Sequence, residues 1–402
     1  MALIVKKFGG SSVKNAECVF RVANIITKDY LAGNDVVVVV SAQGDTTDDL
    51  IDKALEINPK GNSKREMDML LSAGEQISAS LLAMAIQSIG CPAISLLGWQ
   101  AGFNTNSAYS AARIRKIKAD RINSELAQKK IVIVAGFQGI CDNQDITTLG
   151  RGGSDTSAVA LAAALHADRC QIYTDVDGVY TADPRKVKTA RKLSEITYDE
   201  MLELATLGAQ VLNNRSVEMA KKFCVELEVL SSIDPKPGTI VKEITSMEKT
   251  LIKGVALDDK ICRISLTGLQ DTPGVAYKLF EKLAKKNANV DIILQSVGRD
   301  GTKDIAFTVA KGQADDAIAA IEELKDILHY QTLAQDSNIC KLSVVGAGME
   351  THPGVASKMF GALYDAGVNI QMISTSEIKI SVLIDVEHAQ KALNAVHDAF
   401  LD

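Results

Sequence analysis

Lys7-Phe8-Gly9-Gly10-Ser11-Ser12 follows the apolar run Leu3–Lys6 at the start of the chain, and this stretch determines which fold the rest must build. Two adjacent glycines let the backbone approach a ligand closely, because no Cβ atom stands in the way. Successive N–H groups, and a helix expected from Asn15 onward, would face phosphate oxygens, while Lys7 would add a mobile cation. Neither the Walker pattern G-x-x-x-x-G-K-S/T nor the Rossmann pattern G-x-G-x-x-G is present. Gly-Gly-Ser after a strand is more often a plain turn, so this candidate phosphate cradle needs a second element to support it.

Further strands and helices alternate along the N-terminal part of the chain. The aliphatic or β-branched runs are Val36–Val40, Ile131–Gly136, Gln171–Asp175 and Glu226–Ser231. Between them lie helical patterns, of which the Ala/Leu/Ile-rich segment Ser72–Ile89 is the longest. Strands buried on both faces and joined by helical crossovers predict an α/β fold, a mostly parallel-sheet αβα sandwich. Ligands in such sheets bind at the carboxyl ends of the strands, where the cradle falls.

Composition excludes several other classes of protein. The chain has 402 residues, a formal net charge of −6 and only 4% aromatic residues, which gives no basic or aromatic surface for nucleic acid. Its seven cysteines are dispersed and include no C-x-x-C pair, so reduced thiols are expected. A strand starts within three residues of Met1, which leaves no room for a signal peptide. No apolar run approaches the roughly 20 residues needed to span a bilayer, so no membrane segment is expected. These features together predict a cytoplasmic location.

A second glycine loop follows the strand Ile131–Gly136. Gly150-Arg151-Gly152-Gly153-Ser154-Asp155-Thr156-Ser157 leads into an Ala-rich helix. Asp155 in the first turn would be a favourable N-terminal charge in any helix, and that role can coexist with a functional one. A carboxylate facing a phosphate site also requires cations, so Asp155 is expected to position Lys7 or Mg²⁺. Arg151 is suited to a bidentate grip on a carboxylate or phosphate.

The first 230 residues contain a single histidine, His166, on a predicted helix. This argues against a histidine-based triad, a zinc hydrolase or a histidine phosphocarrier. Phosphoryl transfer to a carboxylate fits better, because the acceptor is already a nucleophile and needs no general base. Catalysis then depends on positioning and charge stabilisation.

The C-terminal part of the chain repeats itself beyond the Pro/Gly-rich break Asp234–Gly238. Thr272–Ala276 recurs as His352–Ala356, and each copy opens an amphipathic helix. An asparagine, Asn289 or Asn369, follows fifteen residues after the glycine of each copy, and an apolar strand comes next. The repeated strand-helix-strand-strand-helix order predicts two ferredoxin-like βαββαβ units.

These motifs together resemble the aspartokinases of the amino-acid kinase family. The resemblance lies in K-F-G-G-S-S, V-V-V-S-A-Q-G-D-T-T-D-D-L, G-E-Q-I-S, G-R-G-G-S-D-T-S-A and T-D-V-D-G-V-Y-T-A-D-P-R, and it covers essentially the whole chain. It implies a kinase domain over residues 1–246 and two ACT regulatory units over 247–335 and 336–402. The implied reaction transfers a phosphoryl group from ATP to the side chain of aspartate, the first step toward lysine, threonine and methionine, with Mg²⁺ as cofactor.

The resemblance also assigns roles to individual residues. Lys7 and Asp155 would be catalytic, and no residue is assigned as a dedicated metal ligand. Aspartate would be held by Thr47, Glu75, Arg151 and Ser154. The nucleotide would be bound by Lys7, Phe8, Gly9, Gly10, Ser11, Thr174, Asp175, Tyr180, Asp183, Arg185 and Gln210. Without the family, Glu75 would pass for an ordinary solvated helix residue.

Gln210 departs from the family pattern. Relatives commonly carry a lysine in a G-A/S-K-V/I-L segment, whereas this chain has Gly208-Ala209-Gln210-Val211-Leu212. Glutamine supplies no charge to the phosphates, so nucleotide affinity or the metal requirement would differ unless Lys186 or Arg215 compensates.

The paired ACT units imply control by amino acids and assembly of more than one chain. Candidate effector residues are Asp271, Pro273, Gly274, Val275, Ala276, Asn289, Val290, Asp291 and Gln295 in one unit, and Asn369, Ile370, Ser376 and Glu377 in the other. Lysine, threonine or both would inhibit. A homodimer through the ACT units is the default expectation. An internal start at Met247 would produce a separate regulatory subunit and an α₂β₂ assembly.

Two alternatives remain open at the level of sequence. The first is a related kinase that acts on glutamate, acetylglutamate or a nucleoside monophosphate. The second is a catalytically weak regulator that binds amino acids. The T-T-D-D-L and G-E-Q-I-S segments and the paired sensor units disfavour the first, and Gln210 is the best support for the second.

Overall fold

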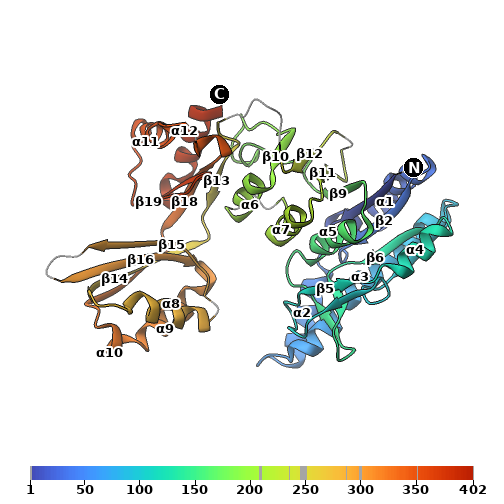
Figure 1. Cartoon of the computed structure of the whole chain (residues 1–402), viewed down its shortest axis with the longest axis horizontal. Helices are drawn as coiled ribbons and strands as arrows, with labels where there is room; N and C mark the ends of the chain where they lie inside the picture. The colour runs from blue at the N-terminus through green and yellow to red at the C-terminus, as the bar shows by residue number, and fades with distance from the viewer. Residues whose placement is uncertain are drawn as a thin grey trace. The chain divides into compact units, whose positions relative to one another are not determined.

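The computed structural model describes residues 2–207, 211–234, 236–244, 251–286, 288–297, 301–350 and 352–401. It contains two compact units, labelled by element in Figure 1. The first comprises Met1–Tyr180 and Arg191–Lys249, and the second comprises Thr181–Ala190 and Thr250–Asp402. Each unit has its own sheets and its own core.

The first unit is built on an eight-stranded sheet in the order β10-β12-β11-β9-β1-β2-β6-β3. Its strands are β1 (Leu3–Phe8), β2 (Asp35–Val40), β3 (Ala93–Leu96), β6 (Ile131–Ala135), β9 (Arg169–Thr174), β10 (Glu195–Thr197), β11 (Leu227–Ser231) and β12 (Thr239–Lys242). Strands β11, β9, β1, β2, β6 and β3 run parallel to one another, while β12 is antiparallel to β11. The predicted mostly parallel sheet is therefore confirmed.

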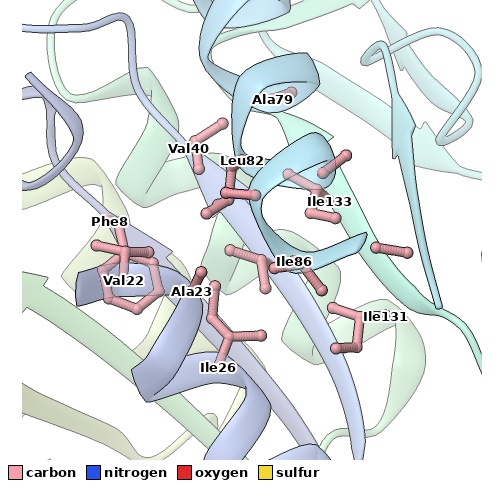
Figure 2. Packing of buried hydrophobic residues seen from close by; sticks show 14 of the residues in the cluster. Phe8, Val22, Ala23, Ile26, Val40, Ala79, Leu82, Ile86, Ile131 and Ile133 are labelled. Carbon is pink, nitrogen blue, oxygen red and sulfur yellow. The ribbon is translucent and has the colours of Figure 1, made fainter. Parts of the chain in front are cut away.

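Helices cover both faces of this sheet. They are α1 (Ala16–Leu31), α2 (Thr46–Ile57), α3 (Lys64–Ser88), α4 (Asp120–Ala127), α5 (Gly153–Leu165), α6 (Tyr198–Thr206) and α7 (Asn214–Phe223). Figure 2 shows α1 and α3 packing on one face, where Val22 and Ile26 meet Phe8, and Leu82 lies near Val40. Helix α5 packs against β1, β2 and β9. The predicted αβα sandwich thus has its core between the sheet and α1 and α3.

Helix α3 is long and apolar enough, by length and composition alone, to cross a membrane. More than half of its apolar stretch is buried inside the unit. Its apolar residues are used in the core around Leu82 and Ile86, as expected for a central helix of a globular unit.

A small four-stranded sheet, in the order β5-β4-β7-β8, completes the first unit. Its strands are β4 (Phe103–Thr105), β5 (Ile114–Ile117), β7 (Gln138–Ile140) and β8 (Ile146–Thr148). The last of them, β8, leads directly into the second glycine loop and α5. This sheet therefore sets where the loop begins.

The second unit contains two four-stranded antiparallel sheets, in the orders β15-β16-β14-β17 and β13-β18-β20-β19. The first sheet has β14 (Ile261–Gln270), β15 (Val290–Val297), β16 (Thr302–Ala310) and β17 (Thr332–Asp336), with α8 (Val275–Lys285), α9 (Ala314–Glu322) and α10 (Lys325–Leu328). The second has β13 (Gly254–Asp258), β18 (Ile339–Val345), β19 (Met372–Thr375) and β20 (Lys379–Asp385), with α11 (Val355–Asp365) and α12 (Ala389–Leu401). Two ferredoxin-like units are confirmed.

Strand β13 does not belong to the ferredoxin-like unit for which it is predicted. The range predicted for the first unit, residues 247–335, contains β13, yet this strand pairs with β18 of the second sheet, with Val255 opposite Val344. Beyond residue 336 the described chain supplies only three strands to this sheet, so β13 fills the remaining edge of β18. The first ferredoxin-like unit is thus inserted between two strands of the second.

The segment Thr181–Ala190 also groups with the second unit, although it lies inside the range predicted for the kinase domain. Ala182 and Val187 are buried in the same core as α11 and α12, and the Val255 N–H donates to the Thr181 carbonyl at 2.7 Å. These are long-range contacts, and the sequence around Thr181 gives no reason to expect them.

Candidate active site

The predicted phosphate cradle lies at the carboxyl end of β1. The backbone turns there, with the Ser12 N–H donating to the Gly9 carbonyl at 3.0 Å. A Cβ atom on Gly10 would lie 2.6 Å from the Ala42 carbonyl oxygen, so only glycine fits against the end of β2. Asn15 then caps α1 by accepting a hydrogen bond from the Cys18 N–H at 2.9 Å. The helix starts where the sequence predicts it.

Lys7 and Asp155 form an ion pair across the sheet face. Lys7 Nζ lies 2.7 Å from Asp155 Oδ1, and the two side chains are only 11% and 12% exposed. Lys7 is on β1, and Asp155 is in the first turn of α5. The structure therefore brings together the cation and the carboxylate that the sequence predicted for the two glycine loops. A nearly buried pair of this kind interacts more strongly than one in water.

Ser154 lies beside this pair because a glycine, Gly136, directly follows β6. A Cβ atom on Gly136 would lie 2.8 Å from Ser154 Oγ and 2.9 Å from a methyl carbon of Val39. The first turn of α5 thus packs directly on the ends of β2 and β6. Ser154 is buried, while Arg151 in the preceding loop is exposed.

Glu75 is almost completely buried, with 4% of the residue exposed. Its Oε1 accepts a hydrogen bond from the Ala42 N–H at 3.2 Å, whereas its Oε2 is buried without a hydrogen-bond partner among the described residues. Burial raises the pKa of the Glu75 carboxyl to about 7, and the Ala42 hydrogen bond offsets only part of this rise. Glu75 is therefore not a solvated helix residue. Thr47, half-buried, lies in the first turn of α2 just beyond Ala42.

The predicted nucleotide loop begins at the end of β9. Thr174 Oγ1 accepts from the Val176 N–H at 3.1 Å, and the Tyr180 hydroxyl donates to Asp177 Oδ1 at 2.7 Å. Asp175 is exposed beside Thr174. The Phe8 side chain is fully buried and stacks on Tyr173 with ring centroids 4.5 Å apart, so only its backbone is available to a ligand.

Ser232 is a residue of this region that the motifs did not indicate. Its N–H donates to the Thr174 carbonyl at 3.0 Å, and its hydroxyl accepts from Ser12 Oγ at 2.8 Å. It therefore ties the end of β11 to the cradle and to the nucleotide loop. The available signal was its position, since Ser231 is the last residue of the parallel strand β11 and Ser232 directly follows it.

The remaining predicted nucleotide residues are Asp183, Arg185 and Gln210. Asp183 and Arg185 belong to the segment that groups with the second unit, and the Arg185 guanidinium donates to both carboxylate oxygens of Asp183 at 3.0 Å. Gln210 lies outside the described residues. Arg215 donates to the carbonyls of Leu149 and Ala112 at 2.8 and 2.9 Å, so its guanidinium is already engaged.

The predicted effector residues lie around two matching helix starts. Gly274 and Gly354 have φ angles of 93° and 99° and precede α8 and α11. Asp271 pairs with Lys303 at 2.9 Å, and Asp291 pairs with Lys341. Pro273, Asn289, Gln295, Asn369, Ser376 and Glu377 are exposed, Ala276, Val290 and Ile370 are half-buried, and Val275 is buried. The internal start at Met247 lies outside the described residues.

Comparison with known proteins agrees with both units. Residues 2–231 match the model of the amino acid kinase family, and residues 264–324 and 342–400 match an ACT domain model. An aspartokinase of Bacillus sp. (strain MGA3) is 50% identical over 401 residues, which span 100% of this chain and 97% of the relative. Solved structures of E. coli aspartokinase III align over 100% of both chains at 26% identity. The complex with aspartate and ADP (R-state) gives a TM-score of 0.83, and that with lysine and aspartate (T-state) gives 0.80.

Proposed function

The chain belongs to the amino acid kinase family, with aspartokinases as relatives over its whole length, and from this premise we propose that it phosphorylates the side-chain carboxylate of aspartate with ATP. The product is 4-phospho-aspartate, and the second unit controls the reaction. The observation that carries the proposal is the nearly buried Lys7–Asp155 pair, which lies where two glycine loops meet the ends of parallel strands.

The chemistry needs no general base. A side-chain oxygen of aspartate attacks the γ-phosphorus of ATP, the bond from that phosphorus to the bridging oxygen breaks, and ADP leaves with the electron pair. Lys7 neutralises negative charge that develops on the phosphoryl oxygens, and Asp155 holds the Lys7 ammonium in place at 2.7 Å. The N-terminus of α5 adds positive potential at the same point.

Aspartate binding would be shared among α3, α2 and the second glycine loop with the start of α5. Glu75 offers a buried carboxylate oxygen with no other hydrogen-bond partner among the described residues, which suits the substrate ammonium. Arg151, with the neighbouring Ser154, suits a carboxylate. Thr47 lies beyond the Ala42 turn and would add a hydroxyl. The two charged groups thus complement the ammonium and the carboxylate of an amino acid.

Mg²⁺ fits the site as a partner of the nucleotide. Within the described residues no group of three or more His, Cys, Asp or Glu side chains is arranged to hold a metal ion. Mg²⁺ is usually held by one or two carboxylates together with substrate phosphates. Asp155 is the carboxylate suited to that role, and the bound ion would supply additional charge neutralisation.

Feedback inhibition by lysine, threonine or both is the regulation we propose. The exposed helix starts at Gly274 and Gly354 present backbone N–H groups that have no partner within their own helices, which suits an amino acid's carboxylate. The structure of E. coli aspartokinase III with lysine supports lysine as one effector. Turnover measured with lysine and threonine, separately and together, is expected to fall, with leucine as a control amino acid. No response to either would exclude this regulation.

We also propose a homodimer formed through the ACT units, located in the cytoplasm, and an α₂β₂ assembly if translation starts internally at Met247. The free cysteines agree with a reducing compartment. N-terminal sequencing of the native protein tests the second subunit, because a C-terminal species starting at Met247 should accompany the full chain. Met247→Leu should remove that species, and an unchanged pattern would contradict it.

A substrate panel tests the proposed function. ADP release is measured with aspartate, glutamate, acetylglutamate and UMP as acceptors. We expect kcat/KM for aspartate to exceed that for glutamate by between about tenfold and about 200-fold, the range that one methylene allows in a fitted site. Preference for another acceptor would assign the chain to a related kinase. Amino-acid binding without turnover on any acceptor would make it a regulator.

A further inference from the structure

Asp68 is a completely buried carboxylate that the mechanism does not use. It lies on α3 with 0% of the residue exposed. Its oxygens accept hydrogen bonds from the Ser110 N–H at 3.0 and 2.9 Å and from the Ser110 hydroxyl at 3.3 Å. They also accept from the Thr148 N–H at 2.9 Å and the Thr148 hydroxyl at 2.7 Å. Burying a charge is costly unless hydrogen bonds compensate it, and here five do.

The two partners of Asp68 hold the glycine loop that carries Arg151. Thr148 is the last residue of β8, and the loop starts at the next residue. Ser110 is on the other side, where its carbonyl oxygen would lie 3.1 Å from a Cβ atom on Gly150. Ser110 itself has a left-handed φ of 67°, a conformation that non-glycine residues rarely adopt unless it is held. Asp68 therefore fixes both the start of the loop and the surface on which it lies.

Helix α7 and its N-cap residue Asn213 also hold this loop. Arg215 donates to the carbonyl of Leu149, and Asn213 Nδ2 donates to the carbonyl of Arg151 at 3.3 Å. Gly152, with a φ of 70°, has no room for a Cβ atom against the Asn213 side chain, which would be 2.2 Å away. The backbone on both sides of the Arg151 side chain is thus held, at Leu149, Arg151 and Gly152.

Asp68 and Glu75 are on the same helix, seven residues apart. Seven residues are about two turns, so both side chains face the interior from one side of α3, about 10 Å apart along its axis. Helix α3 therefore carries Glu75, which is expected to bind the ammonium, and also Asp68, which anchors the loop of Arg151. Arg151 is the residue expected to bind a carboxylate.

We propose that Asp68 is a positioning residue that fixes Arg151 relative to Glu75 and thereby selects aspartate over the longer glutamate. The inference rests on the proposed function. When Arg151 and Glu75 are held in fixed positions, the additional methylene of glutamate displaces its reacting carboxylate from the Lys7–Asp155 pair. A loop released from Asp68 accommodates the longer acid and holds aspartate less well.

Asp68→Asn tests this, because it keeps the shape of the side chain but replaces one acceptor with a donor facing N–H groups. We expect KM for aspartate to rise by about tenfold or more with a smaller change in kcat, and KM for ATP to remain unchanged. The ratio of kcat/KM for aspartate to that for glutamate should fall severalfold. Thr148→Val, which removes one hydroxyl and leaves Asp68 intact, should shift the same ratio in the same direction by less.

Glu125→Gln is the matched control. Glu125 on α4 is also buried in the same unit, but it pairs with Arg121 and Lys130. This variant should lose stability without changing the ratio. If folded Asp68→Asn and Thr148→Val keep the wild-type ratio, or if their KM values for ATP and aspartate rise together, Asp68 has only a structural role. Absence of aspartate-dependent turnover in the wild type would overturn the proposed function, and this inference with it.

Discussion

Lys6 and Lys7 are adjacent in sequence and opposite in role, because successive side chains of a strand point to opposite faces. Lys6 lies on the α1 side of the sheet, completely buried, where it pairs with Asp29 and donates to Gln171 Oε1 and the Tyr173 hydroxyl. Burial lowers the pKa of the Lys6 ammonium. Lys7 lies on the α5 side with Asp155. A shift of β1 by one residue would exchange the two environments.

This pair gives a prediction with an internal control. Lys7→Met should lower kcat by about 10²- to 10³-fold, because it removes the cation facing the transferred phosphoryl group. It should also lower the free energy of unfolding, because it leaves the nearly buried Asp155 carboxylate without its cation. Lys6→Met should leave kcat close to the wild-type value. It should lower the unfolding free energy by about 3 kcal/mol, because the Asp29 carboxylate loses the buried cation with which it pairs. Steady-state kinetics and denaturant unfolding measure the two effects. Equal losses of kcat in both variants would contradict the assignment.

Glu75 makes aspartate binding dependent on pH. The carboxyl must be ionised to bind an ammonium group, and burial raises its pKa to about 7. We therefore expect kcat/KM for aspartate to rise with pH through about 7 and to level off above it, since kcat/KM reports the free enzyme. In Glu75→Gln the value should be low and flat between about pH 6 and about pH 8. A wild-type profile that is flat over the same range would show that Glu75 is not the ammonium ligand.

The same shift has a consequence for stability. The folded carboxyl binds its proton more tightly than the unfolded one, whose ordinary pKa is 4.5. Its contribution to the free energy of unfolding is therefore largest at low pH and falls as the pH rises from about 4.5 to about 7. Glu75→Gln, which carries no titrating group, should lose this part of the pH dependence, and denaturant unfolding at pH values across that range measures it.

Residues with a recognisable local motif could be predicted, and those defined by long-range contacts could not. Lys7 and Asp155 belong to glycine loops, whose chemistry is visible in the sequence. Asp68 occurs in an ordinary amphipathic helix, and its partners Ser110 and Thr148 are 42 and 80 residues away. Ser232 likewise meets Ser12 across 220 residues. A single sequence contains no signal for such pairings.

At the scale of elements, close packing of α5 on the sheet depends on glycines that remove side-chain volume. Gly136→Ala would place a Cβ atom 2.8 Å from Ser154 Oγ and 2.9 Å from Val39, both in the packed core of the site. We expect a loss of roughly 1–3 kcal/mol of unfolding free energy from overpacking, with KM for aspartate raised because Ser154 is displaced. Steady-state kinetics and denaturant unfolding measure both.

Gly361→Ala is the control for that substitution. Gly361 is in α11, where nothing lies within 4 Å of the added Cβ atom, so alanine should leave activity unchanged and stabilise the helix slightly. If Gly136→Ala behaved in the same way, the close approach of α5 to β6 would not matter for the site.

The order of elements was predictable where periodicity and turn residues agree, as in the parallel strands and the repeated Pro-Gly helix starts. The position of β13 was not. Its five residues fit an edge strand of any sheet, and only the free edge of β18 decides where it pairs. Pairing across more than 80 residues is a property of the whole unit and not of the strand.

At the scale of the whole molecule, the two units carry separate tasks, since each has its own core. Lys7→Ala should therefore abolish turnover and leave the affinity for lysine or threonine unchanged. Calorimetric titration of the variant and the wild type with each amino acid measures this. A loss of effector binding in Lys7→Ala would mean that the cradle and the effector sites do not fold and bind independently.

The central claim is that the Lys7–Asp155 pair serves phosphoryl transfer to the side chain of aspartate. The most direct test incubates the purified chain with ATP, Mg²⁺, aspartate and hydroxylamine, which traps an acyl phosphate as its hydroxamate. We predict aspartate-dependent hydroxamate in step with ADP release from the wild type, and none above background from Lys7→Ala. A wild type that releases no trappable acyl phosphate, or a Lys7→Ala variant as active as the wild type, would contradict the account.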